Sequence, residues 1–171
     1  ERLIMETWTG AFPQLLAAHA NVIGVVDPAY WLDLGTPQAF VEGSRDIVAG
    51  RIPSPALPGQ PGRALLLPGA QVSQDAVIAG GSTIGAGAVV EGFATVDGSV
   101  VFDGARIGVG ATVTGSIVGA GAVVGNHCRL NGAVIGDGAV IGAENELLAG
   151  ARVWPDVQLP DCAVRFSSDQ D

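Results

Sequence analysis

The sequence predicts a mainly β protein, in which a parallel β-helix of hexapeptide repeats follows a small α/β segment. The first observation is a six-residue period from about residue 65 to residue 166, where blocks such as "IGVGAT", "VGAGAV" and "IGDGAV" each open with an aliphatic residue. The second is the 17-residue spacing of the five-residue blocks that begin at Val96, Val113 and Leu130, which indicates a three-sided coil. The third is composition, since 26 glycines and 5% aromatic residues leave Val, Ile, Leu and Ala to build the core.

Short elements are expected before the repeat. Residues 12–19, "FPQLLAAH", are typical of a short amphipathic helix with Pro13 in its first turn. Residues 21–27, "NVIGVVD", are predicted to form a strand, and "YWLDLG" at 30–35 is predicted to form a second extended piece.

A second helix is expected to begin after Thr36, whose side chain can cap it, with Pro37 at its first position and Gly50 at its end. Residues 52–64, "IPSPALPGQPGRA", hold four prolines and indicate a stiff, extended linker. The predicted regions are therefore the α/β segment 1–51, the linker 52–64, the β-helix 65–166 and a tail at 167–171.

The repeat has a simple physical logic. Each short extended piece ends at a corner of about 120°, where Gly, Asn and Asp tolerate the positive φ that the turn needs. The opening aliphatic residue points inward, and a small fifth residue lets the corner close. Coils stacked at about 4.8 Å give a prism about 26 Å tall. We expect the regular coils to end within "VWPDVQLPD" at 153–161, where Trp154, Pro155 and Pro160 interrupt the pattern.

Charge excludes several classes of protein. The formal net charge is −9, and the eight basic residues are arginines that are scattered singly along the chain. Without a basic stripe, binding to nucleic acid or to an anionic membrane is not expected. No apolar run approaches the roughly 20 residues of a membrane span, and no secretory signal is visible, so we expect a cytoplasmic protein. Cys128 and Cys162 are expected to be reduced thiols, with Cys128 at the small fifth position of its block.

The segment "YWLDLGTPQAFVEGSRDIVAG", followed by a proline-bearing linker and hexapeptide repeats, resembles the end of the catalytic domain and the left-handed β-helix of sugar-nucleotide pyrophosphorylases. The segments "NGAVIGDGAVIGAENEL", "GARVWPDVQLPD" and "RFSSD" are similar to the actinobacterial branch of the mannose-1-phosphate guanylyltransferase (GDP-mannose pyrophosphorylase) family. The resemblance covers about residues 12–170, and the first ten residues fit it poorly. It supplies the left-handed sense of the β-helix, and it implies synthesis of GDP-mannose and pyrophosphate from GTP and mannose 1-phosphate.

In this family the Asp of the "WLD.GT" motif helps to hold a divalent metal, so the resemblance implies that Asp33 is a ligand of Mg²⁺. The residues by themselves favour Asp33 as the cap of a turn. The Gly-rich phosphate loop and the substrate-binding lysines of the family are absent, so we expect no catalytic residue and no cofactor site in this chain. We expect an inactive C-terminal portion, whose partners are the N-terminal nucleotidyltransferase core of the same enzyme, the nucleotide and the sugar 1-phosphate. The β-helix is expected to serve homo-oligomerisation or regulation.

Three alternatives stay open. The first is another sugar-1-phosphate nucleotidyltransferase, of the glucose 1-phosphate type. The second is a hexapeptide-repeat acyltransferase with His127 as general base, although a histidine next to Asn126 is also typical of a solvated corner. The third is a purely structural β-helix module.

Other conspicuous residues receive structural interpretations. Trp31 is expected in a core, and the bulky Phe93 and Phe102, at outward or corner positions, could mark a subunit or interdomain contact. Acidic residues late in the repeat are expected to form a solvated edge rather than a metal cluster: Asp137, Glu144 and Glu146.

Overall fold

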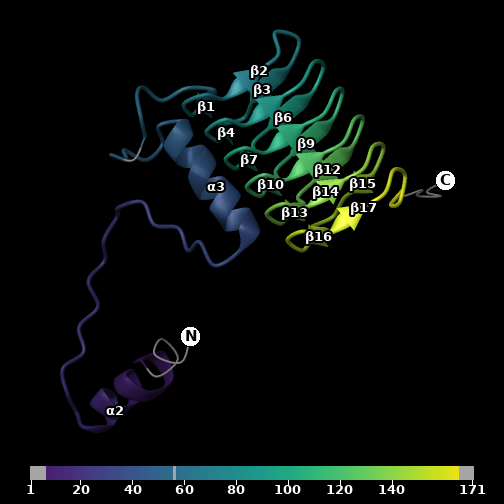
Figure 1. Ribbon diagram of the computed structural model, residues 1–171. Helices are drawn as coiled ribbons and strands as arrows, with labels where there is room; N and C mark the ends of the chain where they lie inside the picture. The colour runs from purple at the N-terminus through teal and green to yellow at the C-terminus, as the bar shows by residue number, and fades with distance from the viewer. Residues whose placement is uncertain (1–6, 56, 166–171) are drawn as a thin grey trace, which may run out of the picture. The chain divides into compact units, whose positions relative to one another are not determined.

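The computed structural model describes residues 7–55 and 57–165, so the predicted tail 167–171, most of "RFSSD" and the first six residues lie outside the described residues. The chain divides into two compact units, Glu1–Trp31 and Leu32–Asp171, which are described separately. The second unit holds three parallel sheets that wind as a β-helix of about six coils (Figure 1). The predicted mainly β fold is confirmed.

The first unit contains the π-helical turn η1 (Thr7–Ala11) and the helix α2 (Phe12–Ala17), which confirms the first predicted helix. The strand predicted at 21–27 is wrong. Val25 and Val26 are 88% and 93% exposed, and no strand among the described residues pairs with this segment. A β-branched run becomes a strand only where another strand accepts its ladder hydrogen bonds, and here none is described.

The second unit begins with α3 (Pro37–Val48), as predicted. The Thr36 hydroxyl accepts a hydrogen bond from the Ala39 amide at 3.1 Å, and this cap satisfies one of the amides left unpaired in the first turn. The helix ends at Val48, and Gly50, the expected stop, follows with a φ of 75° that suits a residue without a side chain. None of the described helices is long and apolar enough to cross a membrane.

The strands of the β-helix fall into three sheets, one for each side of the coil. The first sheet comprises β1 (Ala64–Leu66), β4 (Ser82–Ile84), β7 (Val100–Val101), β10 (Ile117–Val118), β13 (Val134–Ile135) and β16 (Arg152–Val153). The second comprises β2 (Gln71–Val72), β5 (Val89–Val90), β8 (Arg106–Ile107), β11 (Val123–Val124), β14 (Val140–Ile141) and β17 (Gln158–Leu159). The third comprises β3 (Val77–Ala79), β6 (Thr95–Asp97), β9 (Thr112–Thr114), β12 (Arg129–Asn131) and β15 (Glu146–Leu147).

The core consists of columns of like residues stacked from coil to coil. In the third sheet Val96 pairs with Val113 and Val113 with Leu130, so the 17-residue period is the register of the sheet. These three side chains are 0 to 1% exposed. The inward aliphatic residue and the small corner residue are thus confirmed, and the prism is held together by burial of its aliphatic columns.

A buried column of serines explains the five-residue blocks. The amide of Ser99 donates to Ser82 Oγ at 3.1 Å, that of Ser116 to Ser99 Oγ at 3.0 Å, and that of Ala133 to Ser116 Oγ at 3.0 Å. Corners with six residues instead close an amide onto a carbonyl three residues back, as Ala105 does onto Phe102. The hydroxyl therefore replaces the turn carbonyl that a shortened corner cannot supply.

The serine column ends where the coil lengthens. Position 133 is alanine and offers no hydroxyl, and Val134 pairs with Arg152, which lies 152 − 134 = 18 residues further along the chain. The next corner has six residues, and there the Ala151 amide donates to the Leu148 carbonyl at 3.2 Å. The column thus loses its serine where the corner regains a sixth residue and can close through its own backbone carbonyl.

The last described strand, β17, ends at Leu159, so the strands end within 153–161 as predicted, although Trp154 and Pro155 do not interrupt the coil. The coil continues through β16 and β17, and β17 pairs with β14 in register. Pro155 lies two residues after β16 and Pro160 directly follows β17, both at corners, where a missing amide breaks no ladder hydrogen bond. Asp156, with a φ of 59°, takes the place that glycine holds in earlier coils.

Helix α3 packs against the N-terminal coils, beside β4 (Figure 1). The Phe40 and Phe102 rings stack with centroids 6.3 Å apart and planes at 10°. Arg45 Nε donates to the Gly80 carbonyl at 2.9 Å. Phe102 therefore marks a contact between α3 and the β-helix, as its unusual position suggested, whereas Phe93 is 72% exposed.

Candidate functional site

Asp33 lies in the segment that leads into α3. The neighbouring Leu32 and Leu34 pack close to Gly43, where a Cβ would lie 2.9 Å from Leu34 Cδ2 and 3.3 Å from Leu32 Cδ2. Asp33 itself is exposed, and its Oδ1 accepts a hydrogen bond from the Gly35 amide at 3.1 Å. The carboxylate thus caps a turn, and exposure leaves its other oxygen accessible to a ligand.

His127 lies at an exposed corner of the β-helix with a φ of 56°. Its ring covers Gly110 of the preceding coil, where a Cβ would lie 2.6 Å from His127 Nδ1. The next residue in this column of corners is Glu144, with a φ of 58°. The structure brings no carboxylate hydrogen bond to His127, so the orientation that a general base needs is not provided among the described residues.

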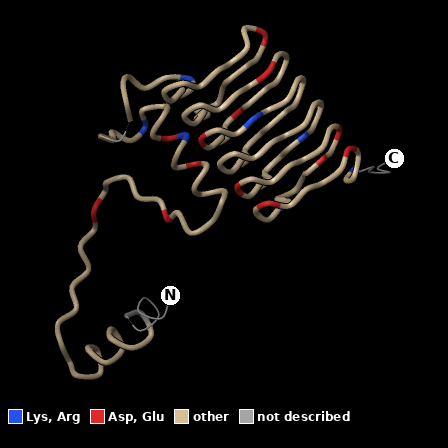
Figure 2. The backbone as a smooth tube through the Cα atoms, in the orientation of Figure 1, with Lys and Arg blue, Asp and Glu red and all other residues tan. Residues whose placement is uncertain are grey.

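The three late acidic residues serve different contacts. Asp137 Oδ1 accepts from the Ala120 amide of the preceding coil at 2.8 Å, and Glu146 pairs with Arg129 at 3.3 Å. Glu144 pairs with Arg165. In the described part of the chain no three His, Cys, Asp or Glu side chains gather as a metal-binding group. Figure 2 shows how acidic residues recur at the corners of the coils.

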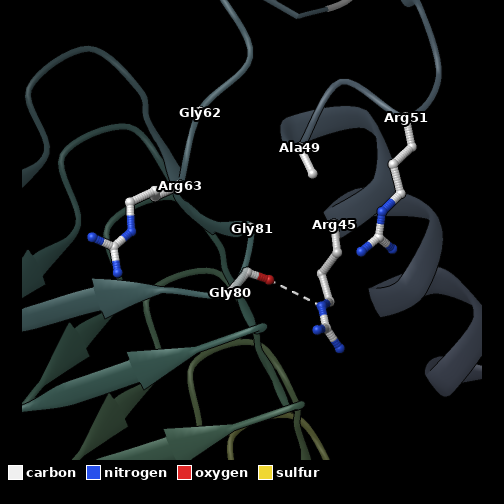
Figure 3. A pocket seen from close by; sticks show the side chains of 7 residues that line it. All are labelled: Arg45, Ala49, Arg51, Gly62, Arg63, Gly80 and Gly81. Carbon is white, nitrogen blue, oxygen red and sulfur yellow. Dashed lines mark hydrogen bonds between the residues drawn. The ribbon is translucent and has the colours of Figure 1, made fainter.

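Sequence reasoning missed a pocket of about 240 Å³ that three arginines line. Arg45 belongs to the last turn of α3, Arg51 directly precedes the linker and Arg63 lies near the end of the linker. Arg51 Nη1 pairs with Asp46 Oδ1 at 2.6 Å, and the Asp46 side chain is only 6% exposed. Figure 3 shows Arg45 and Arg51 beside the space between α3 and Gly80, whereas Arg63 turns to the other side. A signal existed in the sequence, because two arginines bracket the linker.

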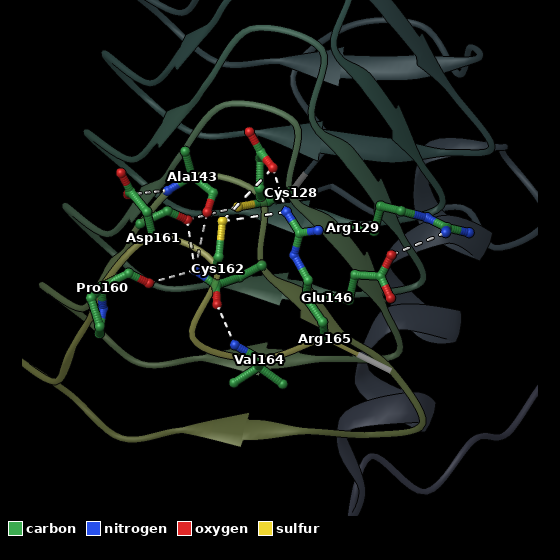
Figure 4. A network of polar contacts seen from close by, with 12 residues as sticks. Cys128, Arg129, Ala143, Glu146, Pro160, Asp161, Cys162, Val164 and Arg165 are labelled. Atoms are coloured by element: carbon green, nitrogen blue, oxygen red, sulfur yellow. Dashed lines mark hydrogen bonds and ion pairs between the residues drawn. The ribbon is translucent and has the colours of Figure 1, made fainter. Parts of the chain in front are cut away.

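Sequence reasoning also missed Asn145, which lies in the last coils with no exposed surface. It occupies the column of small residues that Cys128 occupies one coil earlier. Asn145 Nδ2 donates to the carbonyls of Gly142 and Pro160, both at 2.9 Å, and its Oδ1 accepts from the Val164 amide at 2.8 Å. Figure 4 shows Pro160 and Val164 within this network of polar contacts. This one amide therefore ties the C-terminal segment to the β-helix.

The two cysteines are free thiols in different surroundings. Cys128 has no exposed surface, as its small-residue position predicted, and it donates to the Gly142 carbonyl at 3.0 Å. Burial raises the pKa of the Cys128 thiol, so it stays neutral and unreactive. Cys162 is exposed and lies 3.3 Å from the Arg165 guanidinium. Trp31 is 81% exposed, so the expectation that it lies in a core is wrong, because nothing described packs over it.

Comparison with known proteins places the chain in a family. Residues 61–165 match the family model described as GMPPB C-terminal domain. A mannose-1-phosphate guanylyltransferase of Mycobacterium tuberculosis is 54% identical over 159 residues, which are 92% of this chain and 44% of that relative. The chain thus spans less than half the length of the curated relative that it matches.

The solved structures that match include two of the acetyltransferase domain of PglB from Neisseria gonorrhoeae FA1090. The complex with acetyl coenzyme A shares 24% identity at a TM-score of 0.39, covering 57% of each chain. The other shares 19% identity at a TM-score of 0.31, covering 84% of this chain and 88% of that one. Neither likeness bears on function. The family match covers the β-helix and the relative covers nearly the whole chain, and the chain therefore belongs to the GMPPB C-terminal domain family.

Proposed function

We propose that the chain is the C-terminal part of a mannose-1-phosphate guanylyltransferase, which makes GDP-mannose and pyrophosphate from GTP and mannose 1-phosphate. The observation that carries this proposal is the 54% identity with the M. tuberculosis relative of that name. The match spans 92% of the chain, so it extends beyond the β-helix into the segment before it, where the family resemblance assigns a metal ligand to "YWLDLGTP". A sister enzyme that uses glucose 1-phosphate is the nearest rival.

We assign Asp33 as a ligand of Mg²⁺ in the complete enzyme. Its carboxylate is exposed and makes one recorded hydrogen bond, to the Gly35 amide, so lone pairs stay available to a hard cation that prefers oxygen. The turn with Gly35 would hold the carboxylate in one orientation. When bound, magnesium offsets the repulsion between the phosphates of the two reactants.

The test is pyrophosphate release by the full-length enzyme with GTP and mannose 1-phosphate. Asp33→Asn keeps an oxygen that can cap the turn but removes the charge that holds a cation. Asp27→Asn is a matched control, because Asp27 is also exposed and its Oδ1 accepts from the Ala29 amide at 2.9 Å in the same kind of turn. We expect Asp33→Asn to lower kcat/KM at least about tenfold and to raise the Mg²⁺ concentration needed for half-maximal rate.

If the Asp33 and Asp27 variants are equally active, Asp33 is not a metal ligand and only caps its turn. Release of pyrophosphate with glucose 1-phosphate but not with mannose 1-phosphate would instead overturn the proposed substrate. These two failures are distinct, because the first concerns one residue and the second concerns the enzyme.

For the β-helix we propose a role in homo-oligomerisation or regulation and in contact with the N-terminal nucleotidyltransferase core. In support, α3 in the segment that precedes the linker is packed on the first coils through Phe40 and Phe102. A molar mass from light scattering that equals one chain, for the full-length enzyme, would refute the oligomeric role. No observation favours acyl transfer through His127.

A further inference from the structure

The arginine pocket is unusual for a chain of this charge. Of the seven residues that line it three are arginines and none is acidic, in a protein with a formal net charge of −9. Figure 2 shows basic positions near one another where α3 and the linker meet the first coils, with acidic positions of α3 beside them. Positive charge collected against such a background favours an anionic ligand.

The guanidinium groups keep donors available for such a ligand. Arg45 uses Nε for the Gly80 carbonyl, and Arg51 uses Nη1 for Asp46. Each guanidinium carries five N–H donors, so terminal donors of both remain. No ion pair of Arg63 is recorded among the described residues, and its long side chain can turn toward a bound anion. Three acidic side chains near the pocket lower its positive electrostatic potential but do not line it. Asp46 pairs with Arg51, Glu42 lines an adjoining hollow, and Asp97 lies against Gly80.

The volume of the pocket limits the size of the anion that it can bind. A volume of about 240 Å³ is below the range of about 300–1,000 Å³ that is typical of pockets for larger organic ligands. It suits a phosphate group with a few waters and is small for a whole nucleotide. The planar guanidinium fork also matches phosphate oxygens in pairs.

We propose that this pocket binds a phosphate-sized dianion, either inorganic phosphate or the phosphoryl group of a small phosphate ester. Arg51 and Arg63 stand at the two ends of the linker, and Arg45 stands on α3. A bound dianion therefore joins the ends of the linker to the helix and restrains the segment between them. Linker mobility thus depends on the phosphate concentration.

The test is calorimetric titration of this chain with inorganic phosphate at low ionic strength, with chloride matched. We expect a dissociation constant of about 1 mM or below. Arg63→Gln removes one charge and is expected to weaken binding about tenfold. Arg51→Lys keeps a positive charge next to Asp46 but loses the planar guanidinium that can bind two phosphate oxygens. It is also expected to weaken phosphate binding. Arg152→Gln is the control, since Arg152 is exposed on β16 outside the pocket and its loss changes the net charge equally.

Trypsin supplies a second readout, because it cleaves after arginine and both ends of the linker carry one. Phosphate should slow cleavage after Arg51 and Arg63 in the native chain and in Arg152→Gln. Mannose 1-phosphate and pyrophosphate in parallel titrations distinguish a phosphate ester from the free ion as the tighter ligand. The proposal is overturned if no heat of binding appears up to about 10 mM phosphate, or if Arg63→Gln and Arg51→Lys bind as tightly as Arg152→Gln.

Discussion

The buried serine column offers a sharp test of what holds consecutive coils together. Ser99 Oγ accepts from the Ser116 amide at 3.0 Å and can donate to the carbonyls of Asp97 or Val113, at 3.0 and 3.1 Å. Ser99 has no exposed surface, so water cannot replace the hydroxyl. In Ser99→Ala the Ser116 amide loses its only recorded acceptor, and a buried donor without a partner costs about 1–3 kcal/mol.

The expected loss is measured as thermal unfolding of this chain by circular dichroism. For a domain of this size each kcal/mol lowers Tm by about 2–4 °C, so Ser99→Ala should unfold about 2–12 °C lower. Thr112→Ala is the control, because Thr112 is exposed on β9 and its loss should change stability by no more than about 0.5 kcal/mol. If the Ser99 variant unfolds within a degree of the control, the hydroxyl is not what satisfies the shortened corner.

Two further predictions concern the last coils. Asn145→Ala removes three hydrogen bonds, of which those to Pro160 and Val164 join the C-terminal segment to the β-helix. Amide hydrogen exchange should therefore accelerate in residues 158–164 and not in the first coils, and uniform acceleration would contradict this local role. Burial raises the pKa of the Cys128 thiol in the folded state. The stability that this neutral thiol contributes is therefore complete below the usual thiol pKa, and it is lost as pH rises through the pKa of Cys128 in the folded protein. Cys128→Ala should therefore flatten the fall in Tm above about pH 8.5, and an unchanged slope would count against the raised pKa.

Much of the β-helix could be predicted from sequence because its rules are local. The inward aliphatic residue, the small corner residue and the 17-residue register all follow from a short repeating pattern, as the pairing of Val96 with Val113 confirms. The handedness could not be predicted this way, and it came from the family resemblance. The strand expected at 21–27 failed because its hydrogen-bonding partner is a non-local requirement that propensity does not report.

The site was less predictable, for physical reasons. Asp33 could be singled out because a motif surrounds it, whereas the arginines of the pocket are separated along the chain and meet only when the linker folds back onto α3. Asn145 looked like one more corner residue, since a small position in the repeat gives no hint that an amide there has three partners.

The length of a β-helix is not limited by its repeat, since every completed turn exposes the same backbone groups to which a further turn can bind. In the earlier turns backbone amides donate to carbonyls of the turn that follows, as Arg129 does to Asn145 at 2.8 Å. The side-chain oxygen of Asn145 instead takes up the amide of Val164. In the last described turn the Val164 amide thus has a buried side-chain acceptor, which the alanines of the same column, Ala94 and Ala111, could not supply.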